Sequence, residues 1–153
     1  MPKRKLIAHV MNQSKLVCLA PEISVSAASR KMFERHVGAV MVTAGDKLLG
    51  IVTERDINFQ VVALARNPRT TVLSDIMTEE PDTVPYDAPV SEVFEMIQNC
   101  NYRHIPVEKN GAVVGVVSMR DLFMEIKQEL EDDIHERDEF MFGSGYSVPV
   151  EAH

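Results

Sequence analysis

Cysteine is scarce in this 153-residue chain, which has two cysteines and no tryptophan. Cys18 and Cys100 form no Cys-x-x-Cys motif, and two cysteines are too few for a disulfide framework. We therefore expect reduced thiols and a cytoplasmic location. None of the five histidines is paired with another histidine or a cysteine at the spacing of metal ligands, so no metal site is expected.

Long apolar runs are also missing. No stretch approaches the roughly 18 apolar residues that a membrane span needs, so we expect no membrane association. The short apolar stretch that follows the basic N-terminus ends at Asn12-Gln13, which argues against a secretory signal. The content of 45% apolar and 25% charged residues is typical of a globular protein.

Charge is distributed unevenly along the chain, whose net charge is −7. Residues 1–70 hold 11 basic and 5 acidic side chains, whereas residues 71–153 hold 5 basic and 18 acidic ones. The cluster Lys3-Arg4-Lys5 has no interleaved aromatic residues, so we expect a flexible, solvated arm and no nucleic-acid partner. Alternatively, the opposite charges help the two halves, or two subunits, to associate.

The chain does contain an internal repeat. Residues 48–57 read LLGIVTERDI, and residues 113–122 read VVGVVSMRDL, at an offset of 65 positions. Aligned without a gap, residues 10–60 and 75–125 share seven identities, three of which define a G-x-x-x-x-R-D block. The alternative is a chance likeness of two unrelated βα units. A true duplicate usually packs against its copy and holds ligands between the two.

Each copy is predicted to be a β-α-β-β-α unit, from its apolar periodicity and turn residues. The first copy comprises an extended stretch at 16–19, a helix at 24–36 with Ser24 as N-cap, strands at 38–43 and 48–53, and a helix at 55–66. The second comprises a strand at 83–85, a helix at 89–99, strands at 104–108 and 112–118, and a helix from near Arg120. One unit leaves a sheet face uncovered, so we expect an α/β (α+β) fold with two sheets packed face to face.

The chain is accordingly divided into a basic arm (1–9), a first repeat (10–66), a linker (67–74), a second repeat (75–127) and an extension (128–153). Apolar residues near 3.6-residue spacing predict one long C-terminal helix to about Glu139. A loop at Gly143-Ser144-Gly145 and a disordered end should follow. We expect the helix to pack on a partner subunit; the alternative is an acidic surface helix.

This order of elements resembles a tandem pair of cystathionine β-synthase (CBS) domains, a Bateman module, of the stand-alone bacterial or archaeal type. The resemblance covers about residues 8–127 and rests on the segments GIVTERD, DIMTEEPDTV and RHIPVEKNGAVVGVVSMRD. It implies a regulatory sensor that binds an adenosine-containing ligand between the repeats and forms a homodimer. The ligand would be AMP, ADP, ATP, S-adenosylmethionine or an NAD-type molecule, and a conformational change would pass to an unknown regulated protein. No cofactor is required.

The repeated motif has a physical reading that agrees with such a site. An aspartate at the start of a helix can accept two hydrogen bonds from the cis-diol of ribose. Helix N–H groups and a hydroxyl one turn earlier suit a phosphate or ribose oxygen. Equally, Asp56 and Asp121 can cap their helices together with Thr53 and Ser118. The two roles do not exclude each other.

The resemblance implies two clefts of different composition. The first is expected to contain Thr53 and Asp56 with Thr78 and the strand-start residues His36, Val37 and Gly38. The second is expected to contain Ser118 and Asp121 with Tyr102, Arg103 and His104, and to face Gln13. By the family's pattern, Arg103 would hold a phosphate, and Tyr102 would stack on the purine or lie at its edge. Gly38 stands where the second repeat has Arg103, which weakens the phosphate affinity expected of the first cleft.

Two alternatives stay open within these clefts. Arg55 and Arg120 either contact phosphates or lie on the helix surface as solvated charges. His104 either approaches the ligand or is a packed structural residue.

No enzyme is predicted, because the sequence has no nucleophile elbow, Walker loop, dinucleotide-binding glycine motif, HExxH motif or shared pair of carboxylates. The alternative function is a ligand-free dimerisation scaffold whose clefts are vestigial.

Overall fold

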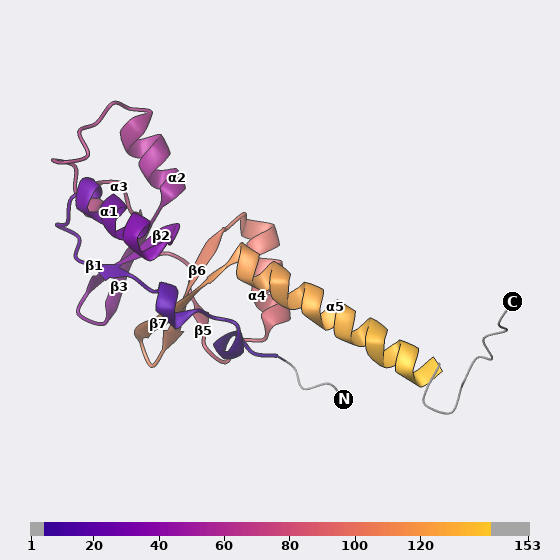
Figure 1. The fold of residues 1–153 in the computed structure, drawn as a ribbon. Coiled ribbons are helices and arrows are strands. Elements are labelled where there is room, and N and C mark those ends of the chain that lie inside the picture. Colours follow the sequence, from indigo (N-terminus) through magenta and orange to yellow (C-terminus); the bar gives the residue numbers. More distant parts are fainter. Residues whose placement is uncertain (1–4, 142–153) are drawn as a thin grey trace, which may run out of the picture.

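Two small sheets, one from each repeat, form the centre of the structure (Figure 1). The computed structural model describes residues 5–141. The first sheet has the strand order β1-β2-β3-β4 and the second the order β5-β6-β7. Their bounds are β1 Cys18–Leu19, β2 Ala39–Ala44, β3 Lys47–Thr53, β4 Thr78–Glu79, β5 Val84–Pro85, β6 His104–Lys109 and β7 Ala112–Ser118.

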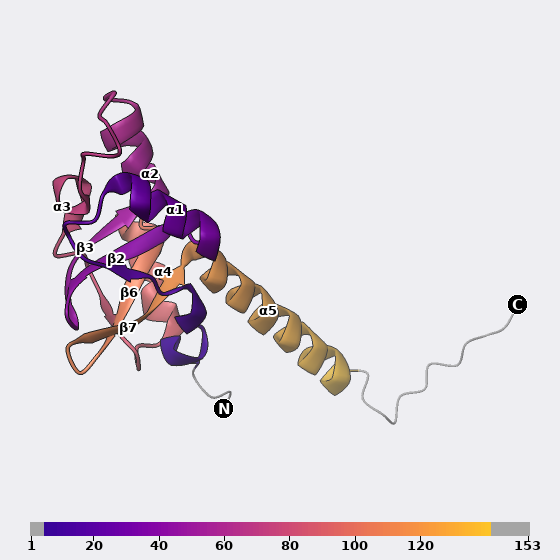
Figure 2. The ribbon, with the colours of Figure 1, turned by 60° about the vertical axis from the view of Figure 1, so that its left-hand side comes forward.

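Helices cover the outer face of each sheet (Figures 1 and 2). The longer ones are α1 (Val25–Arg35), α4 (Val90–Cys100) and α5 (Met119–Met141), and the short ones are η1 (Ile7–His9), η2 (Gln13–Lys15), α2 (Glu54–Ile57), η3 (Asn58–Val62) and α3 (Leu73–Ile76). Helices α1, η3 and α3 pack on the first sheet, and α4 with the start of α5 packs on the second. The Ser24 side chain accepts a hydrogen bond from Ala27 N–H, which confirms the expected N-cap.

The two repeats have the same strand register. In each, a short strand pairs parallel with the first strand of an antiparallel hairpin. Ala39 lies opposite Thr53 in the first hairpin, and His104 lies opposite Ser118 in the second. The predicted β-α-β-β-α unit and the α+β class are therefore confirmed.

Side chains of the strands alternate between two cores, as the period of two requires. On β2, Val40 and Val42 face the helices, whereas Met41 faces the other sheet. Met41 and Ile51 of the first sheet pack there against Val116 of the second. The expected face-to-face packing of the two sheets is confirmed, and it creates the boundary at which the clefts lie.

Each repeat is completed by a segment that precedes the other repeat in the sequence. We call residues 5–16 and 71–82 the crossing segments. Ile7, in the first, is fully buried in the core of the second repeat, and its N–H donates to Ala88 O at 2.8 Å. Leu73, in the second, is fully buried in the core of the first repeat, and its N–H donates to Ile23 O at 2.9 Å.

The expectation of a flexible arm at the N-terminus is wrong for residues 5–9. Besides the burial of Ile7, the Lys5 ammonium forms an ion pair with Glu125 on α5. Val90 N–H donates to the Lys5 carbonyl at 3.1 Å, so the backbone is also held. Apolar burial and these backbone hydrogen bonds outweigh the solvation of a short basic segment. The boundaries proposed for the sequence domains stay a prediction.

Crossing also explains why glycine recurs in the repeated motif. A Cβ atom at Gly50 would lie 2.8 Å from the Thr78 carbonyl oxygen, because β4 pairs with β3 at this point. At Gly115 the nearest atom would be Met11 Sδ, also at 2.8 Å. Both glycines leave room for the crossing segment of the neighbouring repeat.

Gly50→Ala is therefore expected to lower the free energy of unfolding by about 1–3 kcal/mol, because backbone must move to admit the methyl group. Gly115→Ala should have a smaller effect, since the Met11 side chain can change rotamer. Urea unfolding of both variants measures the difference. Equal effects would contradict the role given to the Thr78 carbonyl.

Of the two helices that follow the repeated motif, the first differs in extent from the prediction. The helix expected at 55–66 begins at Glu54 and ends at Val62, with Ala63 N–H donating to Asn58 O, five residues earlier. Ala65 then has a left-handed φ of 55°, which ends the helical path before Arg66. The long C-terminal helix is confirmed, from Met119 to Met141. The loop and disordered end expected from residue 143 lie outside the described residues.

Beyond its first turns, α5 leaves the body of the protein (Figure 2). Leu122 is fully buried, whereas Leu130 and Ile134 are 58% and 60% exposed. Over residues 5–141 no helix combines the length and the apolar character that a membrane crossing needs.

Candidate functional site

Two clefts lie at the boundary between the repeats, and each contains one copy of the repeated motif. The Asp56 cleft contains Thr53 and Asp56, and the Asp121 cleft contains Ser118 and Asp121. Their volumes are about 270 and 510 Å³. A space of this order suits a small molecule.

The motif starts a helix with reciprocal hydrogen bonds in both repeats. Asp56 N–H donates to Thr53 Oγ1 at 3.2 Å, and Thr53 N–H donates to Asp56 Oδ2 at 2.8 Å. Ser118 and Asp121 exchange the same two bonds, both at 3.1 Å. The capping role considered for these residues is thus confirmed, and this box satisfies N–H groups that a helix start leaves free.

Capping leaves part of each carboxylate available. The hydrogen bonds that the Asp56 and Asp121 carboxylates accept all go to Oδ2. Across residues 5–141, Oδ1 of either side chain has no hydrogen-bond partner. A carboxylate fixed by its helix and open on one oxygen is a preorganised acceptor for hydroxyl groups.

The structure corrects the grouping of residues into clefts. Tyr102, Arg103 and His104 lie with Thr53, Asp56 and Thr78 in the Asp56 cleft, not in the Asp121 cleft alone as expected. His36, Val37 and Gly38 lie with Ser118, Arg120 and Asp121, on the opposite side from the expected one. Each cleft therefore combines the motif of one repeat with the strand start of the other.

The reason for this exchange is the sheet-to-sheet packing. A strand start and the motif of the same repeat lie side by side, since Glu54 N–H donates to Gly38 O and Met119 N–H donates to Arg103 O. Placing the sheets face to face then brings each motif opposite the strand start of the neighbouring repeat. Among residues 5–141, three line both clefts, namely Glu54, Arg103 and His104.

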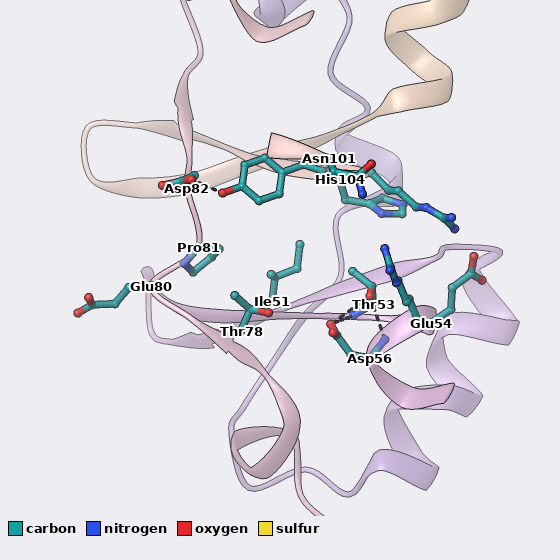
Figure 3. A pocket seen from close by; sticks show the side chains of 13 residues that line it. Ile51, Thr53, Glu54, Asp56, Thr78, Glu80, Pro81, Asp82, Asn101 and His104 are labelled. Carbon is teal, nitrogen blue, oxygen red and sulfur yellow. Dashed lines mark hydrogen bonds between the residues drawn. The ribbon is translucent and has the colours of Figure 1, made fainter. Parts of the chain in front are cut away.

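Figure 3 shows the arrangement of the Asp56 cleft. Thr53 and Asp56 lie on its lower side with Ile51 and Thr78, while His104 and Asn101 lie on the upper side. Glu80 and Asp82 lie at one end, where the second crossing segment passes between the sheets. The cleft thus offers apolar surface in its middle and the Asp82 carboxylate at that end, while the exposed Glu80 side chain points outward from the rim.

Tyr102 is oriented by the crossing segment. Its hydroxyl donates a hydrogen bond to the Asp82 carboxylate, and this bond raises the pKa of Tyr102 to about 12. The phenol therefore stays protonated and fixed at physiological pH. Its ring borders the Asp56 cleft, so the stacking on a purine that the resemblance implied is a prediction for this cleft.

The Asp121 cleft has a different lining. Lys15 of the first crossing segment reaches it, and the predicted Gln13 is not among its lining residues. Arg103 contributes here too, so the phosphate affinity expected to separate the clefts cannot follow from Arg103 and Gly38 alone. Arg55, in the Asp56 cleft, lies 5.2 Å from the centroid of the Phe59 ring, and Arg120 lines the Asp121 cleft.

His104 forms part of the wall between the clefts. A Cβ at Gly38 would lie 3.3 Å from its ring, so glycine there makes room for the imidazole. Its Nδ1 atom is buried and has no hydrogen-bond partner within the described part of the chain. Burial lowers the pKa of His104, although the charges of Glu54 and Asp121 oppose that shift. His104 is both packed and close to the clefts, so both interpretations considered for it hold in part.

A pH dependence follows from the buried imidazole. The lowered pKa means that the unfolded chain binds the His104 proton more readily, so stability falls as the pH drops through about 6.5. We expect His104→Gln to reduce the slope of unfolding free energy against pH between 7.5 and 5 by at most about 1.4 kcal/mol per pH unit. Denaturant unfolding at a series of pH values measures that slope. An unchanged slope would contradict the account.

Several cleft residues were absent from the sequence prediction. They are Lys15, Ala39, Ile51, Glu54, Glu80, Pro81, Asp82, Asn101, Val116 and Met119. Glu54 and Met119 lie inside the repeated motif, and Glu80 to Asp82 lie inside the DIMTEEPDTV segment. The motifs thus indicated which segments form the clefts, but not which of their side chains face them.

No group of three His, Cys, Asp or Glu side chains suited to a metal occurs among residues 5–141. The side chains that line the clefts can form hydrogen bonds with hydroxyl groups, apolar contacts and ion pairs.

Comparison with known proteins adds to this picture. The model of the CBS domain family matches residues 7–62 and again residues 73–128. The uncharacterized protein YlbB of Bacillus subtilis is 39% identical over 101 residues, which cover 65% of this chain and 68% of YlbB. The CBS domain-containing protein CBSCBSPB3 of Arabidopsis thaliana is 30% identical over 118 residues, or 76% of this chain. This chain spans only 21% of the length of that relative.

A solved structure agrees with the fold. The CBS domain pair of protein MJ0100, crystallised in complex with 5′-methylthioadenosine and S-adenosyl-L-methionine, is 25% identical with a TM-score of 0.72. The match covers 82% of this chain and 98% of that one.

Proposed function

The chain belongs to the CBS domain family as a tandem pair, and from this premise we propose that it is a regulatory sensor of an adenosine-containing ligand. The observation that carries the proposal is the fixed aspartate at the helix start in each cleft. A cis-diol can donate both of its hydrogen bonds to such a carboxylate, and ribose presents its 2′- and 3′-hydroxyls in that arrangement. Hydrogen bonds to a charged acceptor are stronger than those between neutral groups.

The remaining parts of the Asp56 cleft suit the rest of an adenosine molecule. Ile51, Pro81 and the Tyr102 ring offer apolar surface for a purine. The Arg103 guanidinium is available to groups attached at the 5′ position. The complex of the MJ0100 domain pair with two adenosine compounds supports this class of ligand.

The proposed sensor acts without catalysis. Because each cleft has walls from both repeats, a bound ligand contacts both and stabilises the arrangement of the sheets that fits it best. Such a shift would reach a regulated protein through the surface helices, among which α5 extends furthest from the body (Figure 2).

The second candidate is a scaffold with vestigial clefts. The observation in its favour is that both aspartates already serve as helix caps. A scaffold predicts no response to any adenosine ligand. It also predicts that Asp56→Ala and Asp121→Ala change stability only by the capping contribution, about 1 kcal/mol each.

Thermal unfolding distinguishes the two candidates. The purified chain is heated with AMP, ADP, ATP, 5′-methylthioadenosine, S-adenosylmethionine or NADH, with guanosine and cytidine as control nucleosides. A ligand at about 100 times its dissociation constant adds roughly 2.7 kcal/mol of stability, which raises the midpoint by several degrees. Stabilisation by an adenosine compound supports the sensor. The same midpoint with every compound supports the scaffold.

We also infer that two copies of the chain associate. Phe33 on α1 is 78% exposed, and Leu130 and Ile134 form an exposed apolar pair one turn apart on α5. Apolar side chains at such spacing are commonly covered by a partner helix. Sedimentation equilibrium tests this inference, and a monomer at all concentrations would contradict it.

The two free cysteines support a cytoplasmic location.

A further inference from the structure

We propose that the two clefts sort adenosine ligands by charge. The Asp121 cleft takes a ligand with a 5′-phosphate, and the Asp56 cleft takes one whose 5′ substituent is positive, such as a sulfonium. This inference rests on the proposed function and adds the ligand class of each cleft.

The pseudo-symmetry of the fold allows a comparison position by position. Each cleft combines the motif of one repeat with the crossing segment and strand start of the other. Residues 65 positions apart therefore occupy equivalent places. Asp56 corresponds to Asp121, and Arg55 corresponds to Arg120, so the motif itself does not distinguish the clefts. Glu54, Arg103 and His104 line both clefts, so their charges do not distinguish one cleft from the other either.

The difference comes from the crossing segments. Glu80 lines the Asp56 cleft, and at its equivalent position Lys15 lines the Asp121 cleft. Asp82 also lines the Asp56 cleft, whereas its equivalent Val17 is buried and lines neither. The crossing segments thus place two carboxylates at one end of the Asp56 cleft, that of Glu80 at the outer rim, and an ammonium group at the Asp121 cleft.

Together with the motif residues, these side chains give the clefts opposite signs. Besides the shared residues, the Asp56 cleft has three carboxylates and one guanidinium group, from Arg55, Asp56, Glu80 and Asp82. The Asp121 cleft has one carboxylate and two fixed cations, from Lys15, Arg120 and Asp121, and it also has His36. Across distances shorter than the Debye length, such charges act together on a bound ion.

The sign of the effect follows from Coulomb's law. A phosphate monoester is close to a dianion at neutral pH, so it is repelled by Glu80 and Asp82 and attracted by Lys15. The side chains are solvent-exposed, so each unit of charge should change the affinity for a dianion by only about threefold. Three units of difference between the clefts then give more than tenfold preference. A neutral 5′-thioether is neither attracted nor repelled by these charges. A sulfonium is attracted by Glu80 and Asp82 and repelled by Lys15.

Isothermal titration with AMP and S-adenosylmethionine, whose sulfonium gives it a net positive charge, tests the proposal on variants that disable one cleft each. Asp121→Asn should weaken AMP binding at least tenfold and leave S-adenosylmethionine binding within about twofold. Asp56→Asn should have the reverse effect. Asparagine keeps an oxygen for the helix cap, and unfolding of the unliganded variants checks that both remain folded.

Charge variants within one cleft give a second, independent readout. In the Asp121→Asn protein, Glu80→Gln should strengthen AMP binding about threefold without changing 5′-methylthioadenosine binding. Glu79→Gln is the matched control, because Glu79 is an exposed neighbour that does not line the cleft. In the Asp56→Asn protein, Lys15→Gln should weaken AMP binding by a similar factor.

The outcomes distinguish a failure of the sorting from a failure of the proposed sensor. AMP and S-adenosylmethionine binding that depends equally on Asp56 and Asp121, or AMP binding lost on Asp56→Asn, would overturn the sorting while keeping the sensor. Equal effects of Glu80→Gln and Glu79→Gln would also overturn it. Wild-type protein that binds neither compound would overturn the proposed function, and the sorting with it.

Discussion

Replacement of Ile7 by alanine is expected to lower the free energy of unfolding by about 2–5 kcal/mol, although Ile7 lies only six residues from the chain start. The side chain is fully buried among apolar residues of the second repeat, including Ile105 and Leu122. Its removal leaves a cavity, which the surrounding strand and helix can fill only in part. The backbone on either side is held by hydrogen bonds to residues 86–90, so the segment cannot easily slide to close the gap.

Ile134→Ala is the matched control, because the same change is made on a side chain that is 60% exposed on α5. Its effect should stay within about 0.5 kcal/mol. Urea unfolding at one pH, with the midpoint and slope compared, measures both variants. A change for Ile7→Ala as small as that for Ile134→Ala would mean that the first crossing segment is not part of the core.

Leu122→Ala is the second change with a large expected effect, again about 2–5 kcal/mol. Leu122 is the buried anchor that docks the first turn of α5 on the second sheet, directly after Asp121. Because α5 begins at the motif, loosening this turn should also disturb the Asp121 cleft. The Asp56 cleft takes its motif from the other repeat and should be less affected.

The control lies on the same helix. Leu130→Ala removes an identical side chain that is 58% exposed, and in the monomer it should change stability by less than about 0.5 kcal/mol. The comparison is made at low protein concentration, where any contact of α5 with a second copy is lost. If Leu130→Ala were as destabilising as Leu122→Ala under those conditions, α5 would be docked along its length, contrary to the structure.

Local chemistry made much of this fold predictable. The ends of the strands in both antiparallel hairpins were predicted within about two residues, because β-branched residues form the strands and turn residues connect them. Ser24 was recognised as a helix cap, and the pairs Thr53–Asp56 and Ser118–Asp121 were recognised as cap or ligand groups. In each case the signal lies within a few residues of the element it specifies.

Long-range exchange between the repeats was not predictable in the same way. A gapless offset of 65 shows that two units are alike, but it does not say which unit a connecting segment completes. The burial of Ile7 in the second repeat and the pairing of Thr78 beside Gly50 are tertiary choices. For the same reason Tyr102 and His36 were assigned to the wrong clefts, whereas Thr78 was correctly placed with Asp56.

The irregular end of the helix after Asp56 was also missed. The apolar spacing continues to Arg66. The helix ends earlier because its last N–H groups donate to carbonyls five residues before them and because Ala65 has a left-handed conformation. Propensity does not distinguish these geometries, because all of them use residues that favour helices.

The central claim is that a ribose diol binds the carboxylates of Asp56 and Asp121. Titration of 5′-methylthioadenosine and its 2′,3′-dideoxy analogue tests it most directly, on the wild type and on Asp56→Asn/Asp121→Asn. In the wild type, loss of the diol should weaken binding about 10- to 100-fold, because hydrogen bonds to a charged group are lost. In the double variant the two compounds should bind with affinities within about twofold of each other. An equal loss in both proteins would show that the diol binds elsewhere, and would contradict the account.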